Sequence, residues 1–142
     1  MRRLFIMRKD LNMSPGKLAA QVSHCAEAYW TNKIKEYAEP FCHYSYIVSD
    51  LIIDEDIFKE YICGSFVKTI CEAKNKNHLL KARDEALEYG FEEGRDFGLI
   101  YDNCLTELEP EEENGTTLTG IWFKPLPDDV SHIISKKYQL YK

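Results

Sequence analysis

The sequence predicts an α/β protein with a small four-stranded mixed sheet and helices on both faces. Short apolar runs bounded by charges or turn residues are typical of buried strands, and the first of them lies at residues 4–7. Segments with helical spacing of apolar residues alternate with these runs along the chain. The length of 142 residues fits a single domain, residues 1–142, with its own core.

The first helix is the most informative element. Ser14 is a typical N-cap, because its hydroxyl accepts a free backbone N–H, and Pro15 suits the first helical position. No further proline or glycine occurs from Lys17 to Trp30, so the helix is expected to continue through that range. One face is apolar and is expected in the core; it carries Leu18, Ala19, Val22, Cys25, Ala26, Tyr29 and Trp30.

Lys17, Gln21 and His24 form a polar strip on the same helix, since they are spaced i, i+4 and i+7. The strip lies beside the start of the helix, where free N–H groups and the positive end of the dipole favour an anion. The pattern therefore indicates either an anion-binding site or a solvated strip next to a core face.

The later elements follow from the same reasoning. Acids at residues 54–56 open a short helix that Gly64 is expected to end. Asn75 or Asn77 caps a longer helix that stops at Gly90. Further strands are expected at residues 66–71, 97–101 and 116–123, and a last helix follows residues 125–129. Residues 41–46 are rich in aromatics, and residues 47–53 fit either a helix or a strand.

Composition and charge exclude several classes of protein. Five cysteines without a Cys-x-x-Cys pair argue against a disulfide framework or a zinc site. No apolar run approaches the length of a membrane span, and residues 2–8 do not form a signal peptide, so a cytoplasmic protein is expected. The net charge of −6 argues against a large nucleic-acid footprint. Residues 1–35, however, carry seven basic and two acidic side chains, which form either a basic face for an anionic substrate or an uneven surface without a function.

Three stretches of the chain resemble a known family. Residues 17–26 read Lys-Leu-Ala-Ala-Gln-Val-Ser-His-Cys-Ala and follow Arg-Lys-Asp-Leu-Asn-Met at residues 8–13. This string resembles the start of the archaeal and eukaryotic type of peptidyl-tRNA hydrolase. Asp102 and Thr106 are similar to positions of that family's Asp-Ala-Gly-Arg-Thr-Gln-Ile patch, and residues 119–125 keep the spacing of its Thr-x-x-x-Ile-Gly-Pro segment. The resemblance spans nearly the whole chain, apart from an insertion near residues 38–53 that is atypical of the family.

The resemblance implies hydrolysis of the ester bond between tRNA and a peptide or an N-blocked amino acid, which recycles the tRNA. It implies peptidyl-tRNA as the partner, no metal and no other cofactor, and a homodimer. The residues that it assigns to catalysis are Lys17, His24, Asp102 and Thr119, and those that it assigns to substrate binding are Gln21, Thr106, Arg8 and Lys9.

Each assigned role leaves alternatives open. Lys17 either neutralises a phosphate of the acceptor end or stabilises the oxyanion, unless it is only a surface charge. Asp102 either orients another group, acts as the base, or merely caps a turn. His24 either activates water, is held in one tautomer by Asp102, or only forms a hydrogen bond to a backbone carbonyl. Thr106 and Thr119 would donate to the ester or the ribose. We expect Lys17, Asp102 and Thr119 to converge on one substrate atom.

Two departures from the family pattern predict weak binding of tRNA. Leu105 stands where the family has an arginine that is suited to a phosphate or a carboxylate. The following loop carries five acids, Glu107, Glu109, Glu111, Glu112 and Glu113, which would repel phosphates if the loop faced the RNA. Alternatively, the loop is a solvated, mobile connection that points away.

Two other functions are compatible with the residues. A non-catalytic module on the same fold would bind RNA or a protein partner, with Phe41, Tyr44 and Tyr46 as its adhesive surface. A thiol hydrolase would use Cys104 as the nucleophile and His24 as the base.

Overall fold

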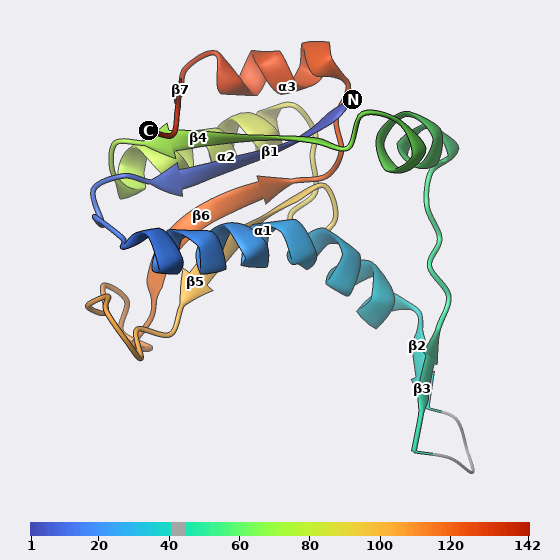
Figure 1. Cartoon of the computed structure of the whole chain (residues 1–142), viewed down its shortest axis with the longest axis horizontal. Helices are drawn as coiled ribbons and strands as arrows, with labels where there is room; N and C mark the ends of the chain where they lie inside the picture. Colours follow the sequence, from blue (N-terminus) through green and yellow to red (C-terminus); the bar gives the residue numbers. More distant parts are fainter. Residues whose placement is uncertain (41–44) are drawn as a thin grey trace.

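The central feature of the computed structural model is a five-stranded mixed sheet with the strand order β5-β6-β1-β4-β7 (Figure 1). The structure describes residues 1–40 and 45–142. Two strands, β1 (Arg2–Arg8) and β4 (Val67–Ala73), are parallel. The antiparallel neighbours are β5 (Phe97–Asp102), β6 (Thr117–Phe123) and β7 (Gln139–Leu140). The α/β class and all four predicted strands are confirmed.

The predicted number of four strands is wrong. β7 adds a fifth strand to the main sheet through its pairing with Cys71 and Glu72 of β4. A separate two-stranded sheet is formed by β2 (Ala38–Pro40) and β3 (Ile47–Ser49). Strands of two or three residues are too short to show an alternation of apolar and polar side chains, so the sequence pattern did not reveal them.

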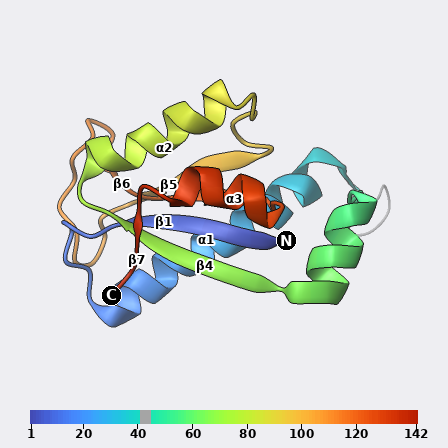
Figure 2. The ribbon, with the colours of Figure 1, turned by 90° about the horizontal axis from the view of Figure 1, so that it is seen from above.

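Helices cover both faces of the main sheet, as predicted. α1 (Pro15–Glu36) packs on one face, where Phe5, Met7 and Trp122 belong to the same core cluster as its buried residues. α2 (Lys76–Glu88) and α3 (Asp128–Ser135) lie together on the opposite face, and α1 lies beneath the sheet in the same view (Figure 2). The sheet is therefore buried on both sides, which explains the continuous apolar run in β1.

Local capping residues set the ends of the two long helices. Ser14 Oγ accepts a hydrogen bond of 3.3 Å from the first turn of α1, and Pro15 is the first helical residue. Asn75 Oδ1 accepts a bond of 2.8 Å from the first turn of α2, so the cap is Asn75 and not Asn77. Gly90 follows α2 with a φ of 94°, a conformation that favours glycine.

β2 and β3 project away from the main sheet beyond the end of α1 (Figure 1). Residues 47–53 begin with a strand, since β3 occupies Ile47–Ser49. The predicted short helix is present as η1 (Ile57–Ser65), and its regular geometry ends at Gly64, which has the non-helical angles φ −114° and ψ −116°, as predicted. Of the predicted aromatic surface, Tyr46 is 69% exposed. Phe41 and Tyr44 lie outside the described residues.

Arg3 is fully buried and connects β1 to β6 and to α1. Its guanidinium donates to the carbonyl oxygens of Phe123 at 2.7 Å, Cys25 at 3.1 Å and Ala26 at 3.2 Å. Burial lowers the pKa of Arg3 to about 10, so the side chain stays charged at neutral pH. Arg8 is buried as well. Two of the cations assigned to the predicted basic face therefore stabilise the interior.

Candidate active site

Three donors converge on the carboxylate of Asp102, at the end of β5. Lys17 Nζ and Gln21 Nε2 both donate to Oδ1, at 2.7 Å and 2.9 Å. The backbone N–H of Cys104 donates to Oδ2 at 2.9 Å. Lys17 and Gln21 belong to successive turns of α1, so the polar strip predicted on that helix faces the end of β5.

Thr119 enters this network through an irregularity in β6. The ladder between β5 and β6 skips Thr119, which is the extra residue of a β-bulge. The next residue, Gly120, faces α1, because a Cβ there would lie 3.3 Å from Cys25 Sγ. Thr119 faces α1 as well, since its hydroxyl donates to Gln21 Oε1 at 2.7 Å. Regular alternation along the strand would have directed the Thr119 side chain to the other face of the sheet, and the bulge instead turns it toward the site.

The donors and acceptors around Gln21 fix the orientation of its amide. An ionised carboxylate only accepts, so the NH₂ group of Gln21 must face Asp102 and its oxygen must face Thr119. The single hydroxyl proton of Thr119 then goes to Gln21, and the chain of donors ends at Asp102. Gln21 is 1% exposed and Thr119 is fully buried, which makes this arrangement rigid.

The surroundings of Asp102 favour its charged form. Its partial burial disfavours ionisation, but the hydrogen bonds from Lys17, the Cys104 N–H and Gln21, together with the charge of Lys17, outweigh it. The net effect lowers the pKa of Asp102 below its ordinary value. At neutral pH the residue is a carboxylate that holds an ammonium and an amide in place.

Thr106 and His24 lie on two sides of this network. Lys17 Nζ donates to Thr106 Oγ1 at 3.3 Å, so Thr106 contacts the predicted catalytic lysine directly. His24 is exposed on α1 and lines a groove with Tyr101 and Asn103, the two neighbours of Asp102. Within the described part of the chain, His24 is not among the hydrogen-bond partners of Asp102.

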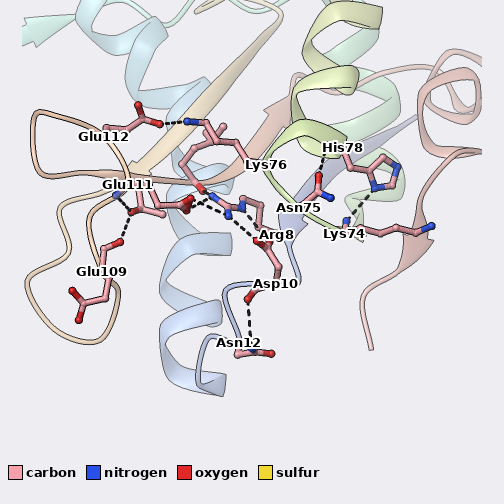
Figure 3. A network of polar contacts seen from close by, with 12 residues as sticks. Arg8, Asp10, Asn12, Lys74, Asn75, Lys76, His78, Glu109, Glu111 and Glu112 are labelled. Carbon is pink, nitrogen blue, oxygen red and sulfur yellow. Dashed lines mark hydrogen bonds and ion pairs between the residues drawn. The ribbon is translucent and has the colours of Figure 1, made fainter.

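Arg8 and Lys9 have different surroundings. The guanidinium of Arg8 is bonded to Asp10 at 2.7 Å and to Glu111 at 2.6 Å, and its side chain is only 4% exposed (Figure 3). It also donates to the carbonyl oxygen of Leu118. Lys9 is 43% exposed and lies 4.3 Å from the centre of the Tyr141 ring. The structure thus leaves Lys9 exposed, whereas Arg8 is buried.

The acidic loop after Asp102 folds back onto the protein, so the alternative of a loop that points away is wrong. Glu107 accepts from the N–H of Ser14 at 2.8 Å and from its hydroxyl at 2.6 Å. Glu111 pairs with Arg8, and Glu112 pairs with Lys76 (Figure 3). The Glu107 carboxylate therefore occupies the start of α1, the place that the sequence predicts for an anionic ligand.

Several parts of the site were missed by the sequence reasoning. The N–H of Cys104 was not assigned a role, although an Asp that accepts from the N–H two residues later is a common turn signal. Cys104 has a φ of 57°, and its Sγ lies 3.4 Å from Thr117 Oγ1. The bulge at Thr119 and the capping role of Glu107 have no local signal. Leu105, in the place of the family's arginine, is 86% exposed.

The carboxylate of Asp102 thus holds an ammonium and an amide beside an open groove, on an α/β fold. Among residues 1–40 and 45–142, no group of three or more His, Cys, Asp or Glu side chains is arranged to hold a metal ion. No helix in the same ranges combines the length and apolar character needed to cross a membrane.

Comparison with known proteins identifies the family. The family model described as "Peptidyl-tRNA hydrolase PTH2" matches residues 1–141. A protein of Thermococcus sibiricus named peptidyl-tRNA hydrolase is 27% identical over 139 residues, which cover 98% of this chain and 96% of that protein. The chain belongs to the PTH2 family of peptidyl-tRNA hydrolases. The predicted family is confirmed.

Proposed function

We propose that this protein hydrolyses the ester bond between tRNA and a peptide or an N-blocked amino acid, and so recycles the tRNA. The observation that carries the proposal is the network of Lys17, Gln21, Asp102 and Thr119, found in a member of the PTH2 family. The name of the Thermococcus sibiricus relative supports the same activity.

Lys17 is the group proposed to stabilise the oxyanion that forms when water attacks the ester carbonyl. An ammonium has three N–H donors, and contacts with Asp102 and Thr106 use two of them. The third is left for a substrate oxygen, as far as the described residues extend. Such a preorganised charge typically contributes roughly 10²–10³ in rate. The hydrogen bond to Asp102 holds the Lys17 side chain in position.

Asp102 is better suited to orient Lys17 than to accept a proton. Its pKa is lowered, and three donors already use its oxygens, so it is a weak base at neutral pH. We therefore assign the activation of water to His24, which is exposed beside Asn103 in the groove. Gln21 and Thr119 then act as positioning residues.

Substrate binding is proposed to involve a smaller set of cations than expected. Lys9, which is exposed, and Thr106, which contacts Lys17, are the residues proposed to contact the acceptor end of tRNA. Arg8 acts indirectly, because it holds Glu111 and thereby the acidic loop. Glu107 lies beside Lys17 and weakens the attraction for phosphates, which supports the prediction of weak tRNA binding. The homodimer stays a prediction from the resemblance, and the cytoplasmic location stays a prediction from the sequence.

The test is release of N-acetyl-aminoacyl groups from charged tRNA by the wild type and by Lys17→Met and Asp102→Asn. Each variant is expected to lose at least roughly two orders of magnitude in kcat. Lys81→Met removes one exposed lysine from α2, on the opposite face of the sheet, and should keep the wild-type rate. An inert wild type that still binds tRNA would refute the proposal and support the non-catalytic alternative.

A further inference from the structure

The outer edge of β5 carries unused main-chain groups next to the site. β5 is the edge strand of the main sheet and has β6 as its neighbour on one side only. Asp96 O accepts a bond from Lys124 N, and Ile100 O lies 3.3 Å from Thr119 Oγ1, so the main chain of these residues faces β6. Successive residues of a strand point alternately, so the N–H and C=O of Leu99 point to the outer edge.

The loop before β5 already pairs with the first part of this edge. Glu93 forms a bridge with Phe97 in the parallel sense, and Gly94 N donates to Phe97 O at 2.7 Å. The loop before β5 thus covers the edge at Phe97 and stops there. Leu99 is the next outward-facing position, and it lies three residues before Asp102. A parallel segment that continued this pairing would run toward the candidate active site.

A groove accompanies this edge between β5 and α1. Its volume is about 530 Å³, and it extends from His24, beside the site, to Lys35 near the end of α1. Its floor includes Gly98, where a Cβ would lie 2.6 Å from Trp122 Nε1. The absence of a side chain at that position leaves room for the indole of Trp122, which also lines the groove. Glu27 and Glu93 also line the groove, which disfavours the phosphates of RNA.

We propose that the edge of β5 binds the peptide part of the substrate as an added parallel strand, with its carboxyl end beside Asp102. This proposal rests on the proposed hydrolase function. The ester must reach Lys17, and β5 runs toward Asp102, so the direction of the peptide is fixed as parallel. Main-chain pairing suits a substrate whose peptide sequence varies, because every residue except proline offers the same N–H and C=O groups.

The geometry also limits which part of the peptide is recognised. Leu99 and Asp102 are three residues apart, or roughly 10 Å along a strand. The amides that pair with Leu99 therefore lie within the last three residues before the ester. Blocking one such amide by N-methylation removes a donor and crowds the edge, and should lower kcat/KM roughly 5- to 30-fold, the range expected for one or two backbone hydrogen bonds.

The kinetic test uses tRNA esterified with N-acetyl-trialanine as the parent substrate. It is compared with a set of esters that are N-methylated at each amide in turn, and with N-acetyl-alanyl-tRNA. The parent ester should be cleaved with the highest kcat/KM. Equal kcat/KM for the parent and all N-methylated esters would overturn the proposal while leaving the hydrolase function intact. Ala28→Phe, which fills the groove, should impair the tripeptidyl ester more than the N-acetyl-alanyl ester. Ala19→Phe, on the opposite side of α1, should affect neither.

A binding test is independent of turnover. The amide of Leu99 in ¹⁵N-labelled protein should shift and exchange its proton more slowly when N-acetyl-trialanine is added. If the wild type cleaves none of the esters, the hydrolase function fails, and this titration alone decides the inference: an unchanged Leu99 amide overturns it. The Leu99 amide could also exchange slowly without added peptide, and more slowly as the protein concentration rises. That result would assign the edge of β5 to a second copy of the chain and would also overturn the proposal.

Discussion

Replacing Thr119 by valine should disrupt the candidate site without creating a cavity. Valine has nearly the same shape as threonine but lacks the hydroxyl that donates to Gln21 Oε1 at 2.7 Å. Thr119 is fully buried and Gln21 is 1% exposed, so water cannot readily replace the lost donor. The amide of Gln21 cannot turn around to compensate, because its NH₂ group is bonded to the carboxylate of Asp102 at 2.9 Å.

The structure sets the size of the effect. An acceptor left unsatisfied in the interior costs about 1–3 kcal/mol of unfolding free energy. Each kcal/mol corresponds to a fall in Tm of roughly 2–8 °C for a domain of this size. The rate should also fall, since Gln21 loses the contact that directs it toward Asp102. Replacing both partners, as in Gln21→Leu with Thr119→Val, removes the unsatisfied oxygen and should cost less than the sum of the single changes.

The assay combines urea unfolding with hydrolysis of N-acetyl-aminoacyl-tRNA at matched folded concentration. Thr69→Val is the matched control, because it makes the same change in β4 where the hydroxyl lies 3.4 Å from Arg2 Nη1. It should change the unfolding free energy by no more than about 0.5 kcal/mol. Equal stability of Thr119→Val and Thr69→Val, or strict additivity in the double variant, would refute the reasoning about a buried unsatisfied oxygen.

Three further predictions concern the charged groups around the site. The pKa of Asp102 is lowered in the folded state, so its contribution to stability is present above the ordinary carboxyl pKa of 3.8 and is lost as the pH falls through the folded value. Asp102→Asn should therefore destabilise more at neutral pH than at pH values below 3.8, as measured by urea unfolding. Glu107→Gln removes a negative charge beside Lys17 and should tighten tRNA binding in a filter assay. Arg8→Met removes the buried cation that bonds Asp10, Glu111 and the carbonyl oxygen of Leu118, and should cost about 1–3 kcal/mol in urea unfolding.

Glu107→Gln and Arg8→Met each have a matched control. Glu113→Gln removes one charge from the same loop, and an equal gain in tRNA affinity would mean that Glu107 acts only through net charge. Arg83→Met removes an arginine of α2 that pairs with the exposed Asp84, and it should change stability by no more than about 0.5 kcal/mol. A difference between wild type and Asp102→Asn that stays constant with pH would contradict the assignment of a lowered pKa.

The agreement between sequence and structure is best where the signal is local. The N-cap at Ser14, the first helical position of Pro15 and the stop at Gly90 depend on residues within one turn of each other. The order of strands and helices followed from apolar runs of at least four residues. β7 was missed because its two residues show no periodicity, and its pairing with β4 depends on where the chain returns after α3.

The site was predicted in part. The polar strip on α1 follows from helical spacing, and the resemblance supplied Asp102 and Thr119 as its partners; the structure brings all of them together. Arg8 was expected at the substrate, but it is buried and paired with Glu111. The sequence did not reveal this pairing, because Glu111 lies far along the chain and no local pattern connects the two residues. The acidic loop was expected either to face the RNA or to point away, and it instead caps α1 through Glu107.

The sequence alone determined the helices, the four longer strands and the face of α1 that carries Lys17 and Gln21, because periodicity and capping act over a few residues. Only the tertiary structure decided that Lys17 meets Asp102 across 85 positions of the chain, that a bulge turns Thr119 toward α1, and that Glu107 rests on the start of that helix. Such contacts depend on the register between distant segments. That register is set by the packing of the whole sheet and is not encoded in any one stretch of the chain.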